Sequence, residues 1–153
     1  MNAGYKATEK FFKQIGWKYE IVENVFRCEV ELNSKTKYAV INIDTEDKCV
    51  VVFVSLNYKI KKSMFADILK MLNLLNMSNP ASSLFLDMEE QMIMCRFGHF
   101  YLDGNVDSNM VGAQVGFSID IIEKLGNILP DLEKKKFSVE QAVALMMMDK
   151  AEM

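Results

Sequence analysis

The sequence predicts an α+β fold in which an antiparallel sheet packs against helices. Residues 25–56 contain three segments in which apolar and polar side chains alternate with a period of two, whereas residues 63–75 carry apolar side chains at helical spacing. Runs of strands beside helices, without strict alternation of the two, are typical of α+β proteins. The chain has 153 residues, of which 50% are hydrophobic and 25% are charged, so we expect a single domain spanning residues 1–153.

The N-terminal half is expected to contain one helix and three strands. Thr8 can cap the helix, and Gly16 can end it, because glycine adopts the left-handed conformation without penalty. The strands follow at residues 25–32, 38–44 and 49–56, where short polar turns join them into an antiparallel meander. The third strand is apolar on both faces and is therefore expected at the centre of the sheet.

The helix over residues 63–75, with Ser63 as its expected cap, has an unusually wide apolar face. A helix that covers one face of a sheet needs an apolar stripe a little over about 100° wide. The apolar side chains of this helix occupy much more of its circumference. It is therefore either sandwiched between two layers or in contact with another molecule.

Two more strands and a long helix are expected after this segment, over residues 83–88, 91–100 and 109–128. Asp107 or Ser108 can cap the long helix, and Pro130 is expected to close it. A last helix is expected from Ser138 to about residue 148, because Ser138 and Gln141 have the spacing of a capping box. The predicted order is therefore helix, three strands, helix, two strands, helix, with an extra C-terminal helix.

Charge and cysteine content narrow the possible partners and location. The net charge is −3, with 18 basic and 21 acidic residues, so no nucleic-acid partner is expected. The longest apolar runs, residues 49–54 and 142–148, are far shorter than the roughly 18 residues needed to span a bilayer, and no membrane association is expected. Three cysteines without a Cys-x-x-Cys pair suit a reducing cytoplasm.

No residue pattern predicts a catalytic, metal or cofactor site. His99, the single histidine, lies four strand residues from Cys95, roughly 13 Å away, which is too far for direct proton transfer. The acidic stretch over residues 103–107 lacks the glycine and the bidentate glutamate of a calcium loop. Phosphate-binding glycine motifs do not occur. We therefore expect no catalytic residue, no metal and no cofactor.

Twelve methionines are many for a chain of this length. Methionine is flexible and is often used on promiscuous binding surfaces. Met64, Met71 and Met77 lie on or just after the second helix, and residues 146–148 are all methionine. Gap-filling in a core and an adaptable apolar surface for a partner both explain this composition.

Three short pieces carry a resemblance to a known family. They are residues 12–17 (Phe-Lys-Gln-Ile-Gly-Trp), 72–76 (Leu-Asn-Leu-Leu-Asn) and 85–87 (Phe-Leu-Asp), the last followed by an acidic turn and an apolar strand. Together with the order of elements over residues 8–129, they resemble the YbjN family of small bacterial proteins. Residues 130–153 then form a C-terminal helical extension.

The resemblance implies a fold and a kind of function. YbjN proteins are similar in fold to the type III secretion chaperones, which are homodimers that bind extended segments of client proteins. YbjN proteins are themselves described as regulators of sensory transduction. The resemblance therefore implies a non-enzymatic, cytoplasmic bacterial module that binds or regulates a partner protein in a chaperone-like manner, as a homodimer. The Met-rich residues 137–153 depart from the family pattern and would be able to cover such an interface.

The wide apolar face of the second helix is the predicted partner or dimer surface, because an isologous dimer buries the same patch from both copies. The residues chosen for it are Met64, Ile68, Met71, Leu72 and Leu75. Two alternatives remain open: a ligand-sensing regulator, or an enzyme with an unrecognised site. A deep pocket lined by polar groups with perturbed pKa values would favour the enzyme.

Overall fold

The computed structural model describes residues 1–79 and 81–148. Within them the chain forms four α-helices, six strands and one 3-10 turn. In chain order these are α1 (Ala3–Ile15), β1 (Glu20–Val22), β2 (Val25–Glu31), β3 (Tyr38–Glu46), β4 (Cys49–Leu56), η1 (Lys62–Met64), α2 (Phe65–Ser78), β5 (Ser83–Asp87), β6 (Met92–Phe100), α3 (Ser108–Glu133) and α4 (Val139–Met147). The predicted α+β class and order of elements are confirmed, with β1 as one additional strand.

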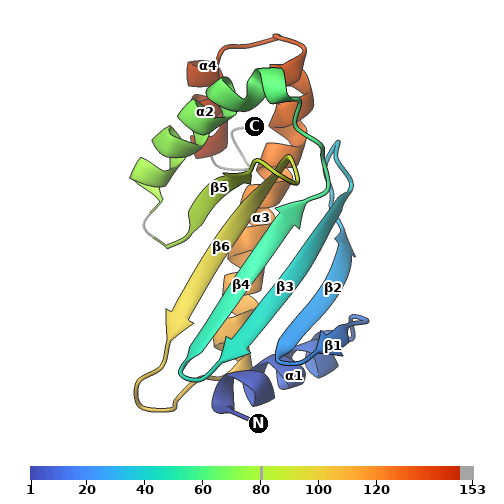
Figure 1. Cartoon of the computed structure of the whole chain (residues 1–153), viewed down its shortest axis with the longest axis vertical. Helices are drawn as coiled ribbons and strands as arrows, with labels where there is room; N and C mark the ends of the chain where they lie inside the picture. The colour runs from blue at the N-terminus through green and yellow to red at the C-terminus, as the bar shows by residue number, and fades with distance from the viewer. Residues whose placement is uncertain (80, 149–153) are drawn as a thin grey trace.

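The strands form one antiparallel sheet in the order β1-β2-β3-β4-β6-β5. After β4 the chain leaves the sheet through α2, and the β5–β6 hairpin then returns so that β6 pairs with β4 (Figure 1). The central position expected for residues 49–56 is therefore correct. The sequence did not indicate β1, because three residues are too few for an alternating pattern to show.

In the part of the chain that the structure describes, the helices cover one face of the sheet and leave the other face, called the bare face below, without a helix. Figure 1 shows α3 running behind the sheet, with α1 at its lower end and α2 and α4 at its upper end. In β4, Val50, Val52 and Val54 are completely buried, whereas the alternating Val51 and Phe53 are only half-buried. β4 is thus apolar on both faces although helices cover only one of them.

The first helix begins earlier than Thr8. Asn2 caps α1 by accepting a hydrogen bond from the backbone N–H of Tyr5 at 2.8 Å. Thr8 instead lies buried within the helix and donates its hydroxyl to the Gly4 carbonyl at 2.8 Å. The expected cap at Thr8 is therefore wrong. Gly16 ends the helix as predicted, in the left-handed conformation with φ of 77°.

The long helix α3 does not stop at Pro130 but continues to Glu133. Proline cannot donate a backbone hydrogen bond to the residue four positions earlier, which is Gly126. The Gly126 carbonyl instead accepts from the backbone N–H of Thr36 at 3.3 Å. The expected stop is therefore wrong, because the β2–β3 loop supplies the missing donor. The boundary expected at residue 130 consequently falls inside a helix.

Helix caps predicted from the sequence are confirmed for α3 and α4 but not for α2. Asp107 caps α3 by accepting from Met110 at 2.9 Å. Ser138 and Gln141 form the predicted capping box of α4. Ser63 caps nothing: it lies in the η1 turn, and α2 begins without a side-chain cap.

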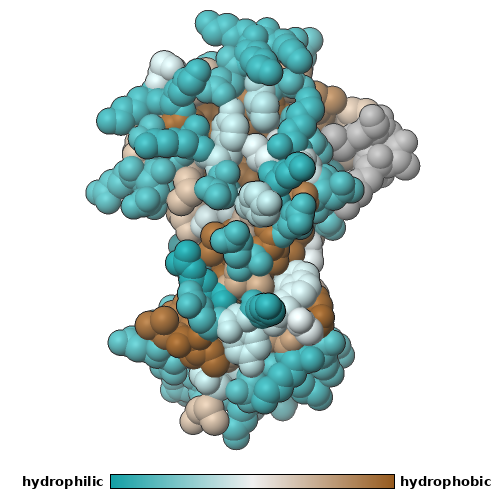
Figure 2. Space-filling view, turned by 90° about the vertical axis from the view of Figure 1, so that its right-hand side faces the viewer, coloured by the Kyte–Doolittle hydropathy of each residue, from teal (hydrophilic) through white to brown (hydrophobic). Residues whose placement is uncertain are grey.

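Figure 2 shows the molecule from the right-hand side of Figure 1. Hydrophilic side chains cover most of the upper end, and hydrophobic side chains gather in separate patches around the middle and the lower end. The edge strand β1 contributes to the exposed apolar surface through Ile21 and Val22.

Candidate functional site

The five residues predicted as a partner surface lie mainly in the core. Ile68, Met71, Leu72 and Leu75 are buried, and Met64 is half-buried and packs against the same core. α2 contacts β5 on one side and α4 on another, so the wide apolar face belongs to a sandwiched helix. These side chains therefore do not form a free surface in this arrangement. Their role in binding a partner stays a prediction.

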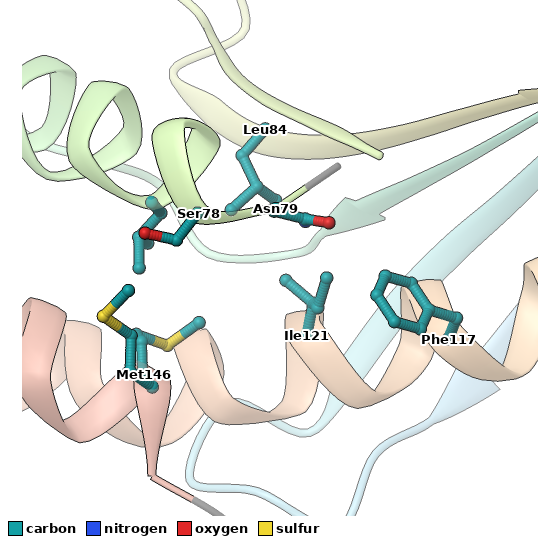
Figure 3. Close-up of a pocket in the computed structure, with 8 residues that line it drawn as sticks. Ser78, Asn79, Leu84, Phe117, Ile121 and Met146 are labelled. Carbon is teal, nitrogen blue, oxygen red and sulfur yellow. The ribbon is translucent and has the colours of Figure 1, made fainter. Parts of the chain in front are cut away.

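Leu75 also reaches an apolar groove at the surface (Figure 3). The groove has a volume of about 350 Å³ and lies between the C-terminal end of α2, strand β5, helix α3 and the last turn of α4. Its lining consists of Leu75, Ser78, Asn79, Leu84, Phe117, Ile121, Met146 and Met147. Five of the six apolar lining residues are long aliphatic or methionine side chains, and the sixth is aromatic.

The groove has a buried floor and an exposed rim. Leu75, Leu84 and Met146 are buried, whereas Phe117 is 41% exposed and Met147 is 54% exposed. The Phe117 ring packs edge-on against Phe97 of β6, with centroids 5.9 Å apart and an angle of 82° between the planes. The rim therefore presents one positioned aromatic ring and one flexible methionine to solvent.

Helix α4 supplies one wall of the groove and is held by few polar contacts. The Lys124 ammonium of α3 donates to the carbonyls of Met146 and Met148, at 3.3 and 2.8 Å. A cation at this position also interacts favourably with the negative end of the helix dipole. At the other end of α4, Lys70 and Glu140 form an exposed ion pair at 2.6 Å.

The bare face of the sheet is a second apolar surface. Its half-buried apolar side chains come from four neighbouring strands; they are Val40, Val51, Phe53, Phe85, Met92 and Met94. Met94 is the register partner of both Ser55 and Phe85, and Phe53 is the partner of Arg96. Apolar side chains thus lie directly opposite each other between β5 and β6, whereas between β4 and β6 they alternate with Ser55 and Arg96.

The cysteine thiols are not activated as nucleophiles. Burial raises the pKa of the Cys28, Cys49 and Cys95 thiols, and for Cys95 it outweighs hydrogen bonds from Ser82 and Ser118. A raised pKa disfavours the thiolate, which is the reactive form. In residues 1–79 and 81–148, no three His, Cys, Asp or Glu side chains gather as ligands for a metal ion.

The fold is that of a small α+β protein with one antiparallel sheet and helices on one face. A family model with the description "Putative bacterial sensory transduction regulator" matches residues 8–128, and the chain therefore belongs to the YbjN family. Helix α4 lies outside the matched residues. The resemblance predicted from residues 12–17, 72–76 and 85–87 is thus confirmed.

The crystal structure of YbjN from E. coli, described as "a putative transcription regulator", has a similar fold. The two chains are 13% identical and superpose with a TM-score of 0.61, over 86% of this chain and 92% of that chain. At this identity the likeness shows the fold alone. No curated protein sequence matches this chain. Among the residues that the structure describes, no helix is long and apolar enough to cross a membrane.

Sequence reasoning missed most of the groove. The main apolar stripe of α3 faces the core; it consists of Val111, Val115, Ile122, Leu125 and Leu129. Phe117 and Ile121 are also four residues apart, and they form a second apolar stripe on another face of α3. That second stripe is the signal that could have found the groove. Its pairing with Leu84 and Met147 depends on tertiary contacts.

Proposed function

We propose that this chain is a non-enzymatic regulatory module that holds a segment of a partner protein. The groove beside α4 carries this proposal, because an apolar lining with an exposed aromatic rim gains free energy when a partner's apolar side chains displace water from it. Two methionines in the lining suit partners of varied shape. Three free cysteines support the cytoplasm as its location.

Site-specific photocrosslinking in living cells tests the groove. We expect a photoreactive benzoylphenylalanine in place of Phe117 to capture a specific protein. The matched control is the same replacement at Met88, which is 55% exposed and follows β5, outside the groove. Identical adducts at both positions, or none at 117, would contradict partner binding in the groove.

We also propose that the chain forms a homodimer through the bare face of the sheet. Strands that are apolar on both faces are typical of sheets covered on both sides, and β4 is such a strand with one face uncovered. A second copy would cover Val51, Phe53 and Met94. This interface leaves the groove free to hold a partner.

Light scattering after size-exclusion chromatography tests the dimer. We expect about twice the chain mass of 17.6 kDa for the wild type and a single chain mass for Phe53→Asp. Leu69→Asp is the matched control, because Leu69 is an apolar residue of α2 that is 43% exposed and lies outside the bare face, so the substitution adds the same charge away from the proposed interface. A wild-type monomer would remove the dimer from the proposal.

A ligand-sensing regulator is the second candidate. The volume of the groove falls within the range of small-molecule pockets, about 300–1,000 Å³. If the groove takes a small apolar ligand, N-phenyl-1-naphthylamine should fluoresce on binding and raise the melting temperature of the wild type. Phe117→Asp should lose both effects. Equal fluorescence and equal melting shifts in the wild type and in Phe117→Asp would show that the probe binds outside the groove.

A further inference from the structure

We propose that the trough between α2 and α3 in which α4 sits is a binding site for an amphipathic helix of a partner protein, and that α4 occupies this site within the chain. The inference rests on the proposed function and names the segment of the partner that is bound. It also explains why the predicted partner surface on α2 lies buried.

Helix α4 contacts the rest of the chain in the way that a docked helix contacts a groove. It packs against both α2 and α3. Its buried side chains are Val139, Ala142 and Met146, at positions i, i+3 and i+7, while Glu140 and Ala144 are exposed. This spacing is the one by which amphipathic helices bind hydrophobic grooves. The family match ends at residue 128, so α4 is added to the matched core.

The attachment of α4 makes exchange feasible. With nine residues it is shorter than the about 12–15 residues that isolated helices need for marginal stability, so its helical form depends on the trough. The link from α3 contains Lys135 with φ of 57°, a left-handed conformation that is uncommon for residues other than glycine. Both side chains of the Lys70–Glu140 ion pair are exposed, so the pair adds little to the free energy that holds α4 in place.

The groove of Figure 3 continues the trough beyond the last turn of α4. In Figure 3, Met146 of α4 and then Ile121 and Phe117 of α3 lie in that order along the groove, with Ile121 and Phe117 about one helical turn apart in sequence. α4 ends at Met147 and leaves the Phe117 ring exposed. A partner helix one or two turns longer would bury Phe117 as well, and this additional burial favours it over α4.

These contacts define the chemistry of the partner. Its helix carries apolar residues at i, i+7 and i+11, and a small residue at i+3 where Ala142 is completely buried. An acidic residue near its start takes the place of Glu140 beside Lys70.

A labelled peptide with the sequence of residues 137–148 is the probe, and fluorescence anisotropy measures its binding to the full-length chain. Ala142→Asp in the protein places a charge in the trough and releases α4, because an unpaired buried charge is costly. We expect this variant to bind the peptide at least about tenfold more tightly than the wild type, in which α4 competes. Ala144→Asp is the matched control: Ala144 is exposed on the same helix, so binding should stay at the wild-type level.

Two further measurements keep the outcome decisive. If Ala142→Asp does not fold, Lys124→Ala loosens α4 without touching its apolar contacts, and should give a smaller gain in peptide affinity. Folded variants that bind the peptide no better than the wild type would overturn the proposal. A wild-type dimer that the peptide converts to monomers would also overturn it, by assigning the trough to a second copy. If the variants do not bind the peptide but a photoreactive residue at position 117 still captures a specific protein, the trough proposal is wrong and the proposed function stands.

Discussion

The backbone N–H of Thr36 donates to the carbonyl of Gly126 at 3.3 Å, across the junction between the β2–β3 loop and α3. This carbonyl is the one that Pro130 leaves without an intrahelical donor. The same loop adds a hydrogen bond from the Lys35 backbone to Asn127 at 3.0 Å and an ion pair from Lys35 to Asp131 at 2.7 Å. The β2–β3 loop therefore attaches to α3 at the turn where Pro130 removes an intrahelical hydrogen bond.

Gly126→Ala is expected to destabilise the protein. A Cβ at this position would overlap the Thr36 hydroxyl oxygen and lie 2.7 Å from that of Ser34, so the loop would have to move. Overpacking of this kind typically costs about 1–3 kcal/mol. Urea denaturation measures the change in the free energy of unfolding.

Gly116→Ala is the matched control in the same helix. Nothing lies within 4 Å of a Cβ built there. Alanine is favoured over glycine in helix interiors by about 1 kcal/mol, so this variant should be more stable than the wild type. A loss of stability in both variants would show that the close approach of Thr36 is not the cause.

Asn76→Ala is expected to loosen the β5 edge of the sheet. The Asn76 side chain accepts from the backbone N–H of Leu84 and donates to the Leu84 carbonyl, both at 2.8 Å, in the way that a neighbouring strand would. Loss of these partners leaves two polar groups unpaired at a sheet edge, at a cost of about 1–3 kcal/mol. Thermal melting measures the effect. Asn73→Ala, at an exposed position of α2, should leave the melting temperature nearly unchanged.

Tyr58 should lose its phenolic proton at a higher pH than an ordinary tyrosine does. Burial, followed by its hydrogen bond to Glu133 and the charge of that carboxylate, raises its pKa from 10.0 to about 12. The raised pKa means that the folded protein favours the neutral phenol of Tyr58 more than the unfolded chain does. The contribution of Tyr58 to the free energy of unfolding is therefore complete below pH 10 and is lost as the pH rises from about 10 to about 12. Ultraviolet absorbance titration, compared with Tyr58→Phe, measures this pKa.

Glu133→Gln separates the causes of that shift. The variant should lower the pKa of Tyr58 but leave it above 10.0, since burial is the largest cause and is unaffected. In the wild type, the same hydrogen bond acts in the other direction on the carboxylate: together with the charge of Lys61, it lowers the pKa of Glu133. An unchanged tyrosine titration in Glu133→Gln would exclude the carboxylate as a cause.

The three thiols should react slowly with iodoacetamide at pH 7. Burial raises all three pKa values and keeps the thiolate fraction small. Cys49 is half-buried, whereas Cys28 and Cys95 are buried, so mass spectrometry should find Cys49 labelled first and labelled faster as the pH rises toward 9. Rapid labelling of Cys95 at pH 7 would contradict its burial.

The sequence predicted most of the fold because its signals are local. The alternating patterns of β2, β3 and β4, the Gly16 stop, and the caps at Asp107 and Ser138 each depend on residues close in the chain. The error at Pro130 arose because a distant segment changes the local preference, whereas the error at Thr8 arose within the first helix itself. Thr8 follows an earlier cap at Asn2, and Pro130 is tolerated because Thr36 supplies a donor from the β2–β3 loop.

By itself the sequence determined the order of helices and strands, the central place of β4 and the membership of the YbjN family, because periodicity and motif residues are properties of the chain alone. It also showed that the second helix is apolar over too much of its circumference. Only the tertiary structure decided what covers that helix, since packing α4 on Leu75 depends on contacts about 70 residues apart in sequence. The same packing set Phe117 and Met147 at the rim of a groove and left Phe53 on a bare sheet face.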